Sequence, residues 1–499
     1  MGSGSFSRRS LLKAGGVGGA ALGFGGLSGF AGVARADEDT GQAPARPRGA
    51  KSMIGVPFEP HGDEVRVGIV GVGGRGTSLL RTMLQFPEVR VTAVCDIQPH
   101  MVDAAADIVT DAGQPEPAKY AGRGGDWDDP QEHYELAVEH SRMARAHTKG
   151  NKTDEWAEDD YRALCARDDV DIVVNVTSWE WHHPVCMVAM LEGKHAATDV
   201  PLAMELNHLW DLVKTSELTQ RHCIMLEQVV YWRHHLQLLN MAHEEVFGEL
   251  LCGYGGYENE GLQAAFDSIS TRTPFRYPEG WRRRWWYRRD GDFYSMHGFC
   301  NIAMYMDINR GDKLDTITAK STPQIRKTAF REEHVPSHDP AWDDPPYIKG
   351  DRCLSLVSTE KGRVIEVSHD EDVPSPYSIV HWLTGTKGSF KDHPARIFLE
   401  GKSSGDYDDL ADHSAGFDHW LWEDHGFDGD RAMLFRLFQD MRLGRAPDID
   451  VYESATWTAP IPLSTESLKR NGQPVKVPDF TRGRWEDYRE WIDRPNPEA

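Results

Sequence analysis

A tyrosine and a histidine near the middle of the chain carry the side chains that acid–base chemistry requires. Tyr294 and His297 stand three positions apart at the start of an expected helix over residues 296–309, so both can project into one cleft. Histidine titrates near neutral pH and suits proton transfer. The run over 282–297 reads RRRWWYRRDGDFYSMH, in which arginines beside Trp and Tyr could stack on sugar faces and hydrogen-bond hydroxyls. A solvated basic face is the plainer alternative.

A glycine-rich turn earlier in the chain predicts a dinucleotide site. Residues 65–70 (VRVGIV) are typical of a buried parallel strand, and Gly71, Gly73 and Gly76 follow at G-x-G-x-x-G spacing. Such glycines allow a tight turn, let the backbone approach a pyrophosphate and let the helix pack on the strand. The next strand leads to Asp96, 20 residues past Gly76, which could hydrogen-bond both ribose hydroxyls. Because a carboxylate repels a 2′-phosphate, NAD is favoured over NADP.

Further expected strands end in turns that carry polar and aromatic side chains. The strand over 170–176 precedes residues 177–182 (TSWEWH), the strand over 195–198 precedes Asp199-Val200-Pro201, and the strand over 223–226 precedes the turn 227–233. In open α/β sheets ligands bind outside the carboxyl ends of the strands, so the TSWEWH turn should face the cofactor. Helices are expected between these strands, over residues 101–112, 161–167, 184–192 and 206–219.

From about residue 250 this alternation stops. Strands are expected over 250–257, 314–321, 353–358, 363–369, 377–383 and 388–399 without intervening helices, which suggests an antiparallel sheet, and another helix is expected over 426–443. We therefore predict an α/β chain with two domains. An N-terminal Rossmann dinucleotide-binding domain spans 63–233, with a polar excursion at 114–160 that contains a helix near 131–146. A C-terminal α+β substrate domain with an open, mostly antiparallel sheet spans 234–499.

Residues 1–36 resemble a twin-arginine signal peptide. Arg8 and Arg9 precede a mildly apolar, glycine-rich run, and Ala34-Arg35-Ala36 is a small-x-small cleavage site. A transmembrane anchor is the alternative, but many glycines break the run. We expect export to the periplasm or the extracellular space, no stable membrane anchor after signal cleavage, and an extended lead over 37–62.

Composition argues against several partners and sites. The formal net charge of −23 disfavours nucleic acid and anionic membrane surfaces, which need a basic footprint. The 7 cysteines are scattered without a CxxC pair, so neither a disulfide framework nor a zinc site is expected. His425 lies in an Asp/His-rich stretch over 413–430, but the spacing there is too loose to predict a metal site.

Several motifs together resemble the Gfo/Idh/MocA oxidoreductase superfamily, and within it the NAD-dependent glycosidases of glycoside hydrolase family 109. The similarity spans nearly all of the chain after the signal peptide, except the excursion. The motifs are Gly73-Gly74-Arg75-Gly76, Trp179-Glu180-Trp181-His182, Tyr231 in its turn, Trp281-Arg282, Tyr294-Ser295-Met296-His297-Gly298, Pro374-Ser375-Pro376-Tyr377-Ser378, Gly385-Thr386-Lys387-Gly388 and the VPDFTRG segment at 477–483.

The resemblance implies a hydrolysis that is redox-neutral overall. Bound NAD+ takes a hydride from C3 of the sugar, a base removes the C2 proton, the C1–O bond breaks by elimination, and water addition and re-reduction follow. By position, His297 would be the base with Tyr294 beside it, and Tyr231, Arg282 and Tyr377 would line the sugar site. The implied cofactor contacts are Gly71, Gly73, Gly74, Arg75, Gly76, Asp96, Trp179, Glu180, Trp181, His182, Asp199, Val200 and Gln228. An N-acetylgalactosaminide-like glycoside is the implied substrate, and a homo-oligomer is plausible because sheet faces pair in this superfamily.

Some positions depart from the family pattern. Asp199 replaces a glutamate, Trp232 replaces a glycine and should reshape the sugar pocket, and Trp285 and Trp286 replace two histidines. Two other functions therefore stay open. One is a net NAD-dependent sugar or polyol dehydrogenase, although the catalytic lysine usual in those enzymes is Val200 here. The other is a non-catalytic sugar-binding protein that contains NAD.

Overall fold

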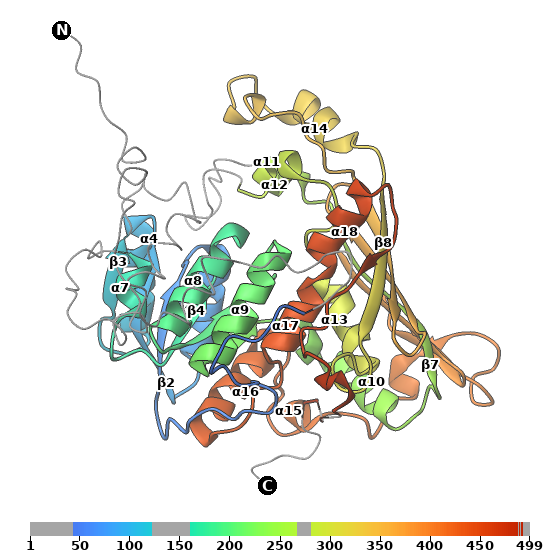
Figure 1. Cartoon of the computed structure of the whole chain (residues 1–499), viewed down its shortest axis with the longest axis horizontal. Helices are drawn as coiled ribbons and strands as arrows, with labels where there is room; N and C mark the ends of the chain where they lie inside the picture. The colour runs from blue at the N-terminus through green and yellow to red at the C-terminus, as the bar shows by residue number, and fades with distance from the viewer. Residues whose placement is uncertain (1–42, 122–159, 267–280, 488, 490, 493–499) are drawn as a thin grey trace.

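The computed structural model describes residues 43–121, 160–266, 281–487, 489 and 491–492. A six-stranded parallel sheet and a nine-stranded open sheet stand side by side (Figure 1). The predicted fold class, a Rossmann domain followed by an α+β part with a mostly antiparallel sheet, is confirmed. The expected signal peptide and the helix expected near 131–146 lie outside the described residues. No helix within the described ranges is long and apolar enough to cross a membrane.

The parallel sheet is built from short, buried apolar runs. Its strands are β1 (Val65–Val70), β2 (Val89–Asp96), β3 (Ala118–Ala121), β4 (Ile172–Asn175), β5 (His195–Thr198) and β6 (Cys223–Met225), in the order β3-β2-β1-β4-β5-β6. The connecting helices are α3 (Gly74–Met83), α4 (Pro99–Asp111), α7 (Tyr161–Cys165), α8 (Trp179–Leu191) and α9 (Leu206–Thr219). Every residue of β4, β5 and β6 is buried, as expected for parallel strands packed on both faces.

Strand β1 lies at the centre of this sheet, between β2 and β4. Its last residue, Val70, pairs with Cys95 of β2 and Asn175 of β4. Three neighbouring strands therefore end at one edge of the sheet, and the strand order reverses at β1. The crevice at such a point is where α/β sheets bind ligands.

The second sheet runs in the order β14-β13-β12-β11-β7-β10-β9-β8-β15. Its strands are β7 (Leu250–Glu258), β8 (Leu314–Ser321), β9 (Arg352–Thr359), β10 (Val364–Asp370), β11 (Ser378–Gly385), β12 (Gly388–Lys391), β13 (Arg396–Leu399), β14 (Asp408–Asp409) and β15 (Val475–Lys476). Strands β7 and β10 pair in parallel, and the other neighbours among the described strands pair antiparallel.

Two expectations for this sheet are wrong. Helices intervene beyond the one expected over 296–309, which is α13 (Met296–Tyr305): α11 (Leu262–Phe266) and α12 (Arg283–Arg288) also lie between β7 and β8, and α14 (Arg326–His334) lies between β8 and β9. Residues 388–399 are a hairpin of β12 and β13 and not one strand. Pro394 in the connecting turn lacks the N–H that a continuous ladder would need.

Helix α13 lies directly on the backbone of β7. A Cβ atom at Gly298 would stand 2.2 Å from the nitrogen of Gly256, and one at Gly255 would stand 2.6 Å from the carbonyl of Gly298. Only glycines permit so close an approach. This contact fixes the first turn of α13, where the predicted catalytic histidine His297 lies.

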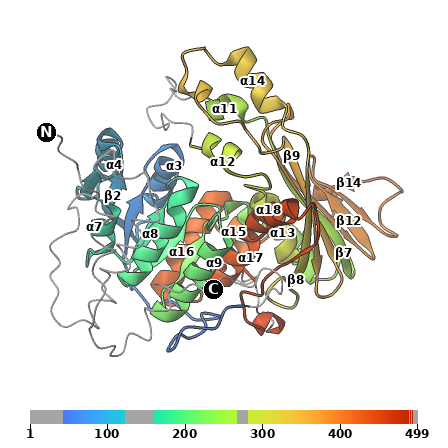
Figure 2. The ribbon, with the colours of Figure 1, turned by 45° about the horizontal axis from the view of Figure 1, so that its top comes forward.

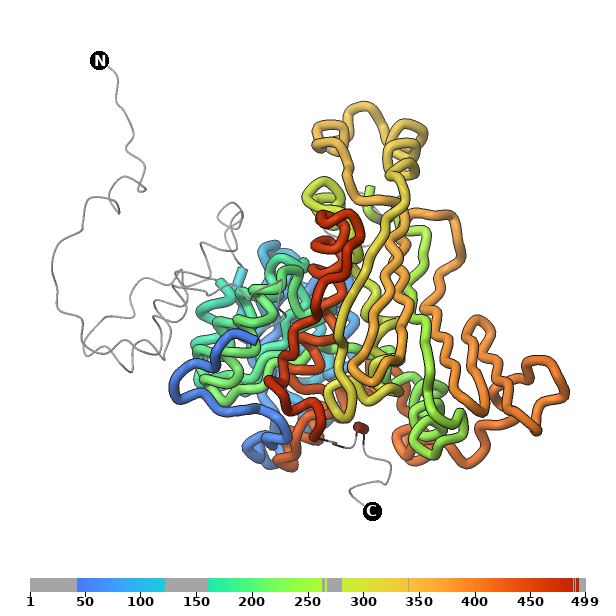
Figure 3. Tube along the Cα trace, turned by 45° about the vertical axis from the view of Figure 1, so that its right-hand side comes forward, coloured from blue at the N-terminus to red at the C-terminus, as the bar shows by residue number. Residues whose placement is uncertain are grey.

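The C-terminal helices return to the parallel sheet. Figures 2 and 3 show α16 (Gly429–Leu443), α17 (Val451–Thr458) and α18 (Pro460–Lys469), drawn in red, between the parallel unit and the second sheet. The amide of Met225 at the end of β6 donates to Ser454 Oγ of α17 at 3.0 Å. Gln439 of α16 donates to Glu88 just before β2, also at 3.0 Å. Helices far along the chain thus complete the packing around the N-terminal sheet.

Candidate active site

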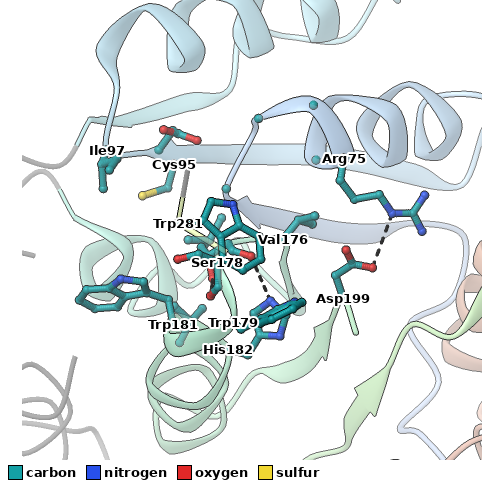
Figure 4. A pocket seen from close by; sticks show the side chains of 18 of the residues that line it. Arg75, Cys95, Ile97, Val176, Ser178, Trp179, Trp181, His182, Asp199 and Trp281 are labelled. Carbon is teal, nitrogen blue, oxygen red and sulfur yellow. Dashed lines mark hydrogen bonds and ion pairs between the residues drawn. The ribbon is translucent and has the colours of Figure 1, made fainter. Parts of the chain in front are cut away.

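A cavity of about 400 Å³ opens at the carboxyl edge of the parallel sheet (Figure 4). Its lining comes from the ends of β1, β2, β4 and β5, from α3, α7 and α8, and from the segments before α12 and α13. The residues are Val70, Gly71, Gly73, Gly74, Arg75, Gly76, Cys95, Asp96, Ile97, Tyr161, Val176, Thr177, Ser178, Trp179, Trp181, His182, Val185, Asp199, Val200, Trp281, Arg282 and Tyr294. The structure therefore brings together most of the residues predicted to contact the cofactor. Glu180 and Gln228 are not among the lining residues.

The glycine turn leaves room for a phosphate group. Gly71 has φ +85°, and a Cβ there would lie 2.6 Å from the Val176 carbonyl group. A Cβ at Gly76 would lie 1.9 Å from the Gly71 oxygen, so the third glycine lets α3 pack against the turn. Gly73 caps α3 without any side-chain hydrogen bond. The first N–H groups of α3 thus have no capping side chain in front of them, as an anion site requires.

Asp96 is held at the end of β2 by two backbone amides. Its Oδ2 accepts from Val72 N at 2.9 Å and its Oδ1 accepts from Gln98 N at 3.0 Å. Burial raises the pKa of Asp96, and these backbone hydrogen bonds oppose that shift. The carboxylate still borders the cavity and has lone pairs left for hydroxyl groups, so its position fits the predicted ribose contact.

Arg75 links the glycine turn to two other parts of the chain. Its guanidinium donates to both carboxylate oxygens of Asp430 on α16, at 2.5 and 2.7 Å, and to Gln228 Oε1 at 3.2 Å. Its Nε lies 3.5 Å from Asp199 Oδ1 (Figure 4). Burial alone would lower the pKa of Arg75, but Asp199 and Asp430 hold it above its usual range. Gln228 therefore acts on the cavity through Arg75, and Arg75 positions Asp199.

Helix α8 begins at Trp179, earlier than expected. The sequence predicted a helix over 184–192, with Pro184 at the first position, where proline is tolerated. In the structure Ser178 is the N-cap and Pro184 lies inside the helix, where it removes one backbone hydrogen bond. Trp179, Trp181 and His182 thus reach the cavity from the first helical turn. The ring nitrogens of His182 lie 2.6 Å from Pro201 O and 3.0 Å from Thr177 O, and burial lowers its pKa.

The two predicted catalytic residues lie together beside the cavity. The rings of Tyr294 and His297 are 4.9 Å apart, edge to face, and Tyr294 lines the cavity. His297 Nδ1 lies 2.8 Å from Glu227 Oε1 and 3.0 Å from Oε2, with both side chains buried. Because a carboxylate only accepts, Nδ1 carries the hydrogen and Nε2 is the nitrogen that can take a proton. Burial raises the pKa of Tyr294 well above its ordinary value, which keeps the phenol protonated.

Glu227 is a functional residue that the sequence analysis did not assign. It follows β6 at the same edge of the sheet as Asp96 and Asp199, and this position was the signal that could have revealed it. Its pairing with His297 joins residues 70 positions apart, so spacing along the chain could not show it.

Aromatic rings and an arginine form the wall next to His297. The Arg282 guanidinium lies 4.8 Å from the Trp179 ring centroid and 4.9 Å from that of Tyr294, and it donates to Glu371 at 2.8 Å. Tyr257 contacts the rings of Tyr294, His297 and Tyr377 at 5.1, 5.7 and 5.8 Å. Tyr377 is 54% exposed and marks the outer end of this wall. Tyr257 and Glu371 are additions to the predicted set.

The comparison with known families now decides the assignment. A family model described as "Glycosyl hydrolase 109, C-terminal domain" matches residues 231–487. The chain belongs to glycosyl hydrolase family 109. It is 44% identical to a family 109 protein of Saccharopolyspora erythraea, with 99% of this chain and 98% of the relative covered. It is also 44% identical to one of Streptomyces filamentosus, with 98% and 94% covered. The chain is a glycosidase-type enzyme.

Solved oxidoreductase structures share the fold of this family 109 chain. The WlbA dehydrogenase of Chromobacterium violaceum, in complex with NADH and UDP-GlcNAcA, has a TM-score of 0.55 at 15% identity and covers 85% of this chain and 98% of its own. An aldose-aldose oxidoreductase of Caulobacter crescentus has a TM-score of 0.55 at 14% identity, with 83% and 99% covered. The fold that the resemblance implied is thereby confirmed.

Tyr231, which was predicted to bind the sugar, lies outside the lining of the cavity. The hydroxyl of Tyr231 donates to Asp448 Oδ2 at 3.1 Å, and the side chain is buried outside the lining of the cavity. Asp448 also accepts two hydrogen bonds from Arg436, at 2.9 and 2.6 Å. The Tyr231 hydroxyl is thus used in a buried polar cluster, and the sugar-binding role expected for Tyr231 stays a prediction.

Of the departures from the family 109 pattern, Asp199 lines the cavity, whereas Trp232, Trp285 and Trp286 lie outside its lining. Trp232 stacks on His235 at 5.7 Å and packs against Gly429, and it is not among the cavity residues. Trp285 packs behind Trp179 at 6.3 Å, and Trp286 packs against Tyr347. The reshaping of the pocket expected from Trp232 stays a prediction. His425 packs against the rings of Trp420, Phe427 and Phe435.

Proposed function

We propose that this family 109 enzyme hydrolyses glycosides with NAD as a cofactor that is regenerated in each turnover. The observation that carries the proposal is the Glu227–His297 pair beside Tyr294, at the rim of a cavity whose glycine turn suits a dinucleotide. A proton-transfer pair next to a redox cofactor is what oxidation at C3 and deprotonation at C2 need.

The residues that would hold the dinucleotide occupy separate parts of the cavity. The glycine turn and the start of α3 would bind the pyrophosphate, and Asp96 would accept from the ribose hydroxyls. Trp179 and Val200 would form apolar walls. When bound, NAD supplies the oxidation of the sugar carbon and its later reversal.

The chain's own residues handle the protons. A ketone at C3 acidifies the adjacent C2 proton, and His297 Nε2 would remove it while Glu227 stabilises the resulting imidazolium. Tyr294, protonated, would donate to an oxygen of the sugar. Arg282, fixed by Glu371, would hydrogen-bond hydroxyl groups against the aromatic wall. A pair of carboxylates flanking the glycosidic bond is not needed by this route.

A specific observation weighs against the net dehydrogenase. Val200 stands where those enzymes usually carry their catalytic lysine, and none of the described residues that line the cavity is a lysine. The buried Glu227–His297 pair weighs against a non-catalytic binding protein, because a sugar-binding site alone has no use for a positioned base.

A double readout tests the proposal. The purified protein is given NAD+ and a panel of aryl α- and β-glycosides of N-acetylhexosamines and hexoses, while aglycon and NADH are followed together. The proposal predicts that an N-acetylgalactosaminide-like glycoside releases its aglycon without net NADH. NADH that accumulates in step with substrate loss would instead establish a dehydrogenase.

A further inference from the structure

Two histidines and an aspartate, whose side chains can bind a metal ion, lie together at a site that the proposed reaction does not use. His234 and His235 begin α10 (Arg233–His243), and Asp392 follows β12. One ligand atom from each lies within 4.8 Å of the others. His234 Nε2 is 3.2 Å from Asp392 Oδ2, and the two imidazole rings are 4.0 Å apart. None of the three lines the cofactor cavity.

His235 supplies the observation that points to a ligand. Its ring is fully buried, and Nδ1 lies 3.0 Å from the hydroxyl of Tyr305. Its Nε2 is buried without a hydrogen-bond partner among the described residues. A buried polar atom without a partner is costly, and a metal ion would satisfy it. The Tyr305 hydroxyl donates to the carbonyl oxygen of His235 at 3.3 Å, so His235 Nδ1 can donate to that hydroxyl and leave Nε2 with a lone pair to give.

A third imidazole faces the same carboxylate. His381 Nδ1 on β11 lies 3.7 Å from Asp392 Oδ2, and its ring centroid is 4.1 Å from that of His235. His381 Nε2 lies 3.0 Å from the carbonyl oxygen of His297, with the nitrogen as donor. The adjacent His393 is occupied elsewhere, since its Nε2 lies 3.0 Å from Ile379 O.

We propose that His234, His235 and Asp392 bind a divalent transition-metal ion of the Zn²⁺ type, with His381 next to it as a further nitrogen. Two imidazoles and a carboxylate suit Zn²⁺, whereas Mg²⁺ and Ca²⁺ take oxygen ligands. The ion would join α10 to the β11–β12 hairpin behind His297. The motif was missed from the sequence because Asp392 is 157 positions beyond His235.

Cobalt titration of the untagged, EDTA-treated protein tests the site, because tetrahedral Co²⁺ absorbs visible light. We expect one strongly bound equivalent with tetrahedral absorption. In His234→Ala and Asp392→Asn the affinity should fall by more than the about 10–100-fold typical of a lost outer-shell partner. His413→Ala is the matched control, since His413 also pairs with an aspartate, Asp408, at 2.9 Å but belongs to no such three-residue group within the described part of the chain.

Thermal unfolding supplies the second readout. Excess Zn²⁺ should raise Tm of the wild type and of His413→Ala, and leave Tm of His234→Ala unchanged. His234 is partly exposed, so its replacement leaves the fold intact, and Tm without metal verifies this. Equal Co²⁺ binding by the wild type and His234→Ala, or a wild type that binds no equivalent, would overturn the proposal.

Discussion

Glu227 and His297 form a buried carboxylate–imidazole pair, with 2.8 Å between Oε1 and Nδ1. Glu227 follows strand β6 of the parallel sheet, and His297 lies in the first turn of α13, which packs on the second sheet. The pair thus spans the two halves of the molecule. It sets which imidazole nitrogen can act as a base, and the account of catalysis depends on it.

Replacing Glu227 by glutamine should lower kcat about 100-fold or more while KM changes little. The amide can donate to His297 Nδ1 and thereby place the hydrogen on Nε2, the wrong tautomer for a base. Steady-state kinetics with NAD+ in excess measures both parameters. Glu466→Gln, a change at an outer carboxylate that pairs with Arg470, serves as the control. Wild-type kcat in Glu227→Gln would contradict the positioning role.

Gly71→Ala should abolish retention of NAD+, because the new methyl group would stand 2.6 Å from the Val176 backbone in the cradle. Gly113→Ala is the matched control, since Gly113 has the same φ of +85° but no atom within 4 Å of its Cβ position. Titration of NAD+ by quenching of Trp fluorescence compares the two. The control carries the backbone strain alone and should bind NAD+ like the wild type. An equal loss of NAD+ binding in Gly71→Ala and Gly113→Ala would refute the steric explanation.

Tyr231→Phe should cost stability more than activity. The change deletes the hydrogen bond to Asp448, worth about 1 kcal/mol, while Arg436 still pairs with that carboxylate. Denaturant unfolding and kcat/KM are measured beside Tyr294→Phe, which should lose activity with little change in stability. If Tyr231→Phe raised KM strongly at unchanged stability, the sugar contact expected from the sequence would be right after all.

Asp211→Asn should stabilise the protein near neutral pH and do so less in acid. Burial raises the pKa of Asp211 from 3.8 to about 6, and Lys214 offsets this only in part. A raised carboxyl pKa means that the folded state loses stability as pH rises from about 4 through about 6. The gain from asparagine should be about 3 kcal/mol at about pH 7.5 and near zero at about pH 4. Urea unfolding of both proteins at both pH values measures this gain in the free energy of unfolding. A gain that is larger in acid than near neutral pH would contradict the prediction.

The parallel sheet could be predicted from the sequence because its strands are local apolar runs followed by glycines or polar turns. Most of the predicted cofactor residues lie together for the same reason, since parallel strands end at one edge. The features that could not be predicted from the sequence depend on contacts between distant segments of the chain. The return of α16 and α17 to the parallel sheet, the Glu227–His297 pair and the use of the Tyr231 hydroxyl by Asp448 each join residues far apart in the chain. The early start of α8 shows that one proline is a weak marker of a helix boundary.

The most direct test of the central claim is the isotopic composition of the product formed in D₂O. The substrate that responds in the aryl-glycoside panel is turned over, and the released sugar is examined by NMR and mass spectrometry. Removal of the C2 proton by His297, followed by water addition, predicts one solvent deuterium bound to C2 of every product molecule. Full turnover with the original hydrogen kept at C2 would contradict the mechanism, because direct hydrolysis at C1 leaves C2 untouched.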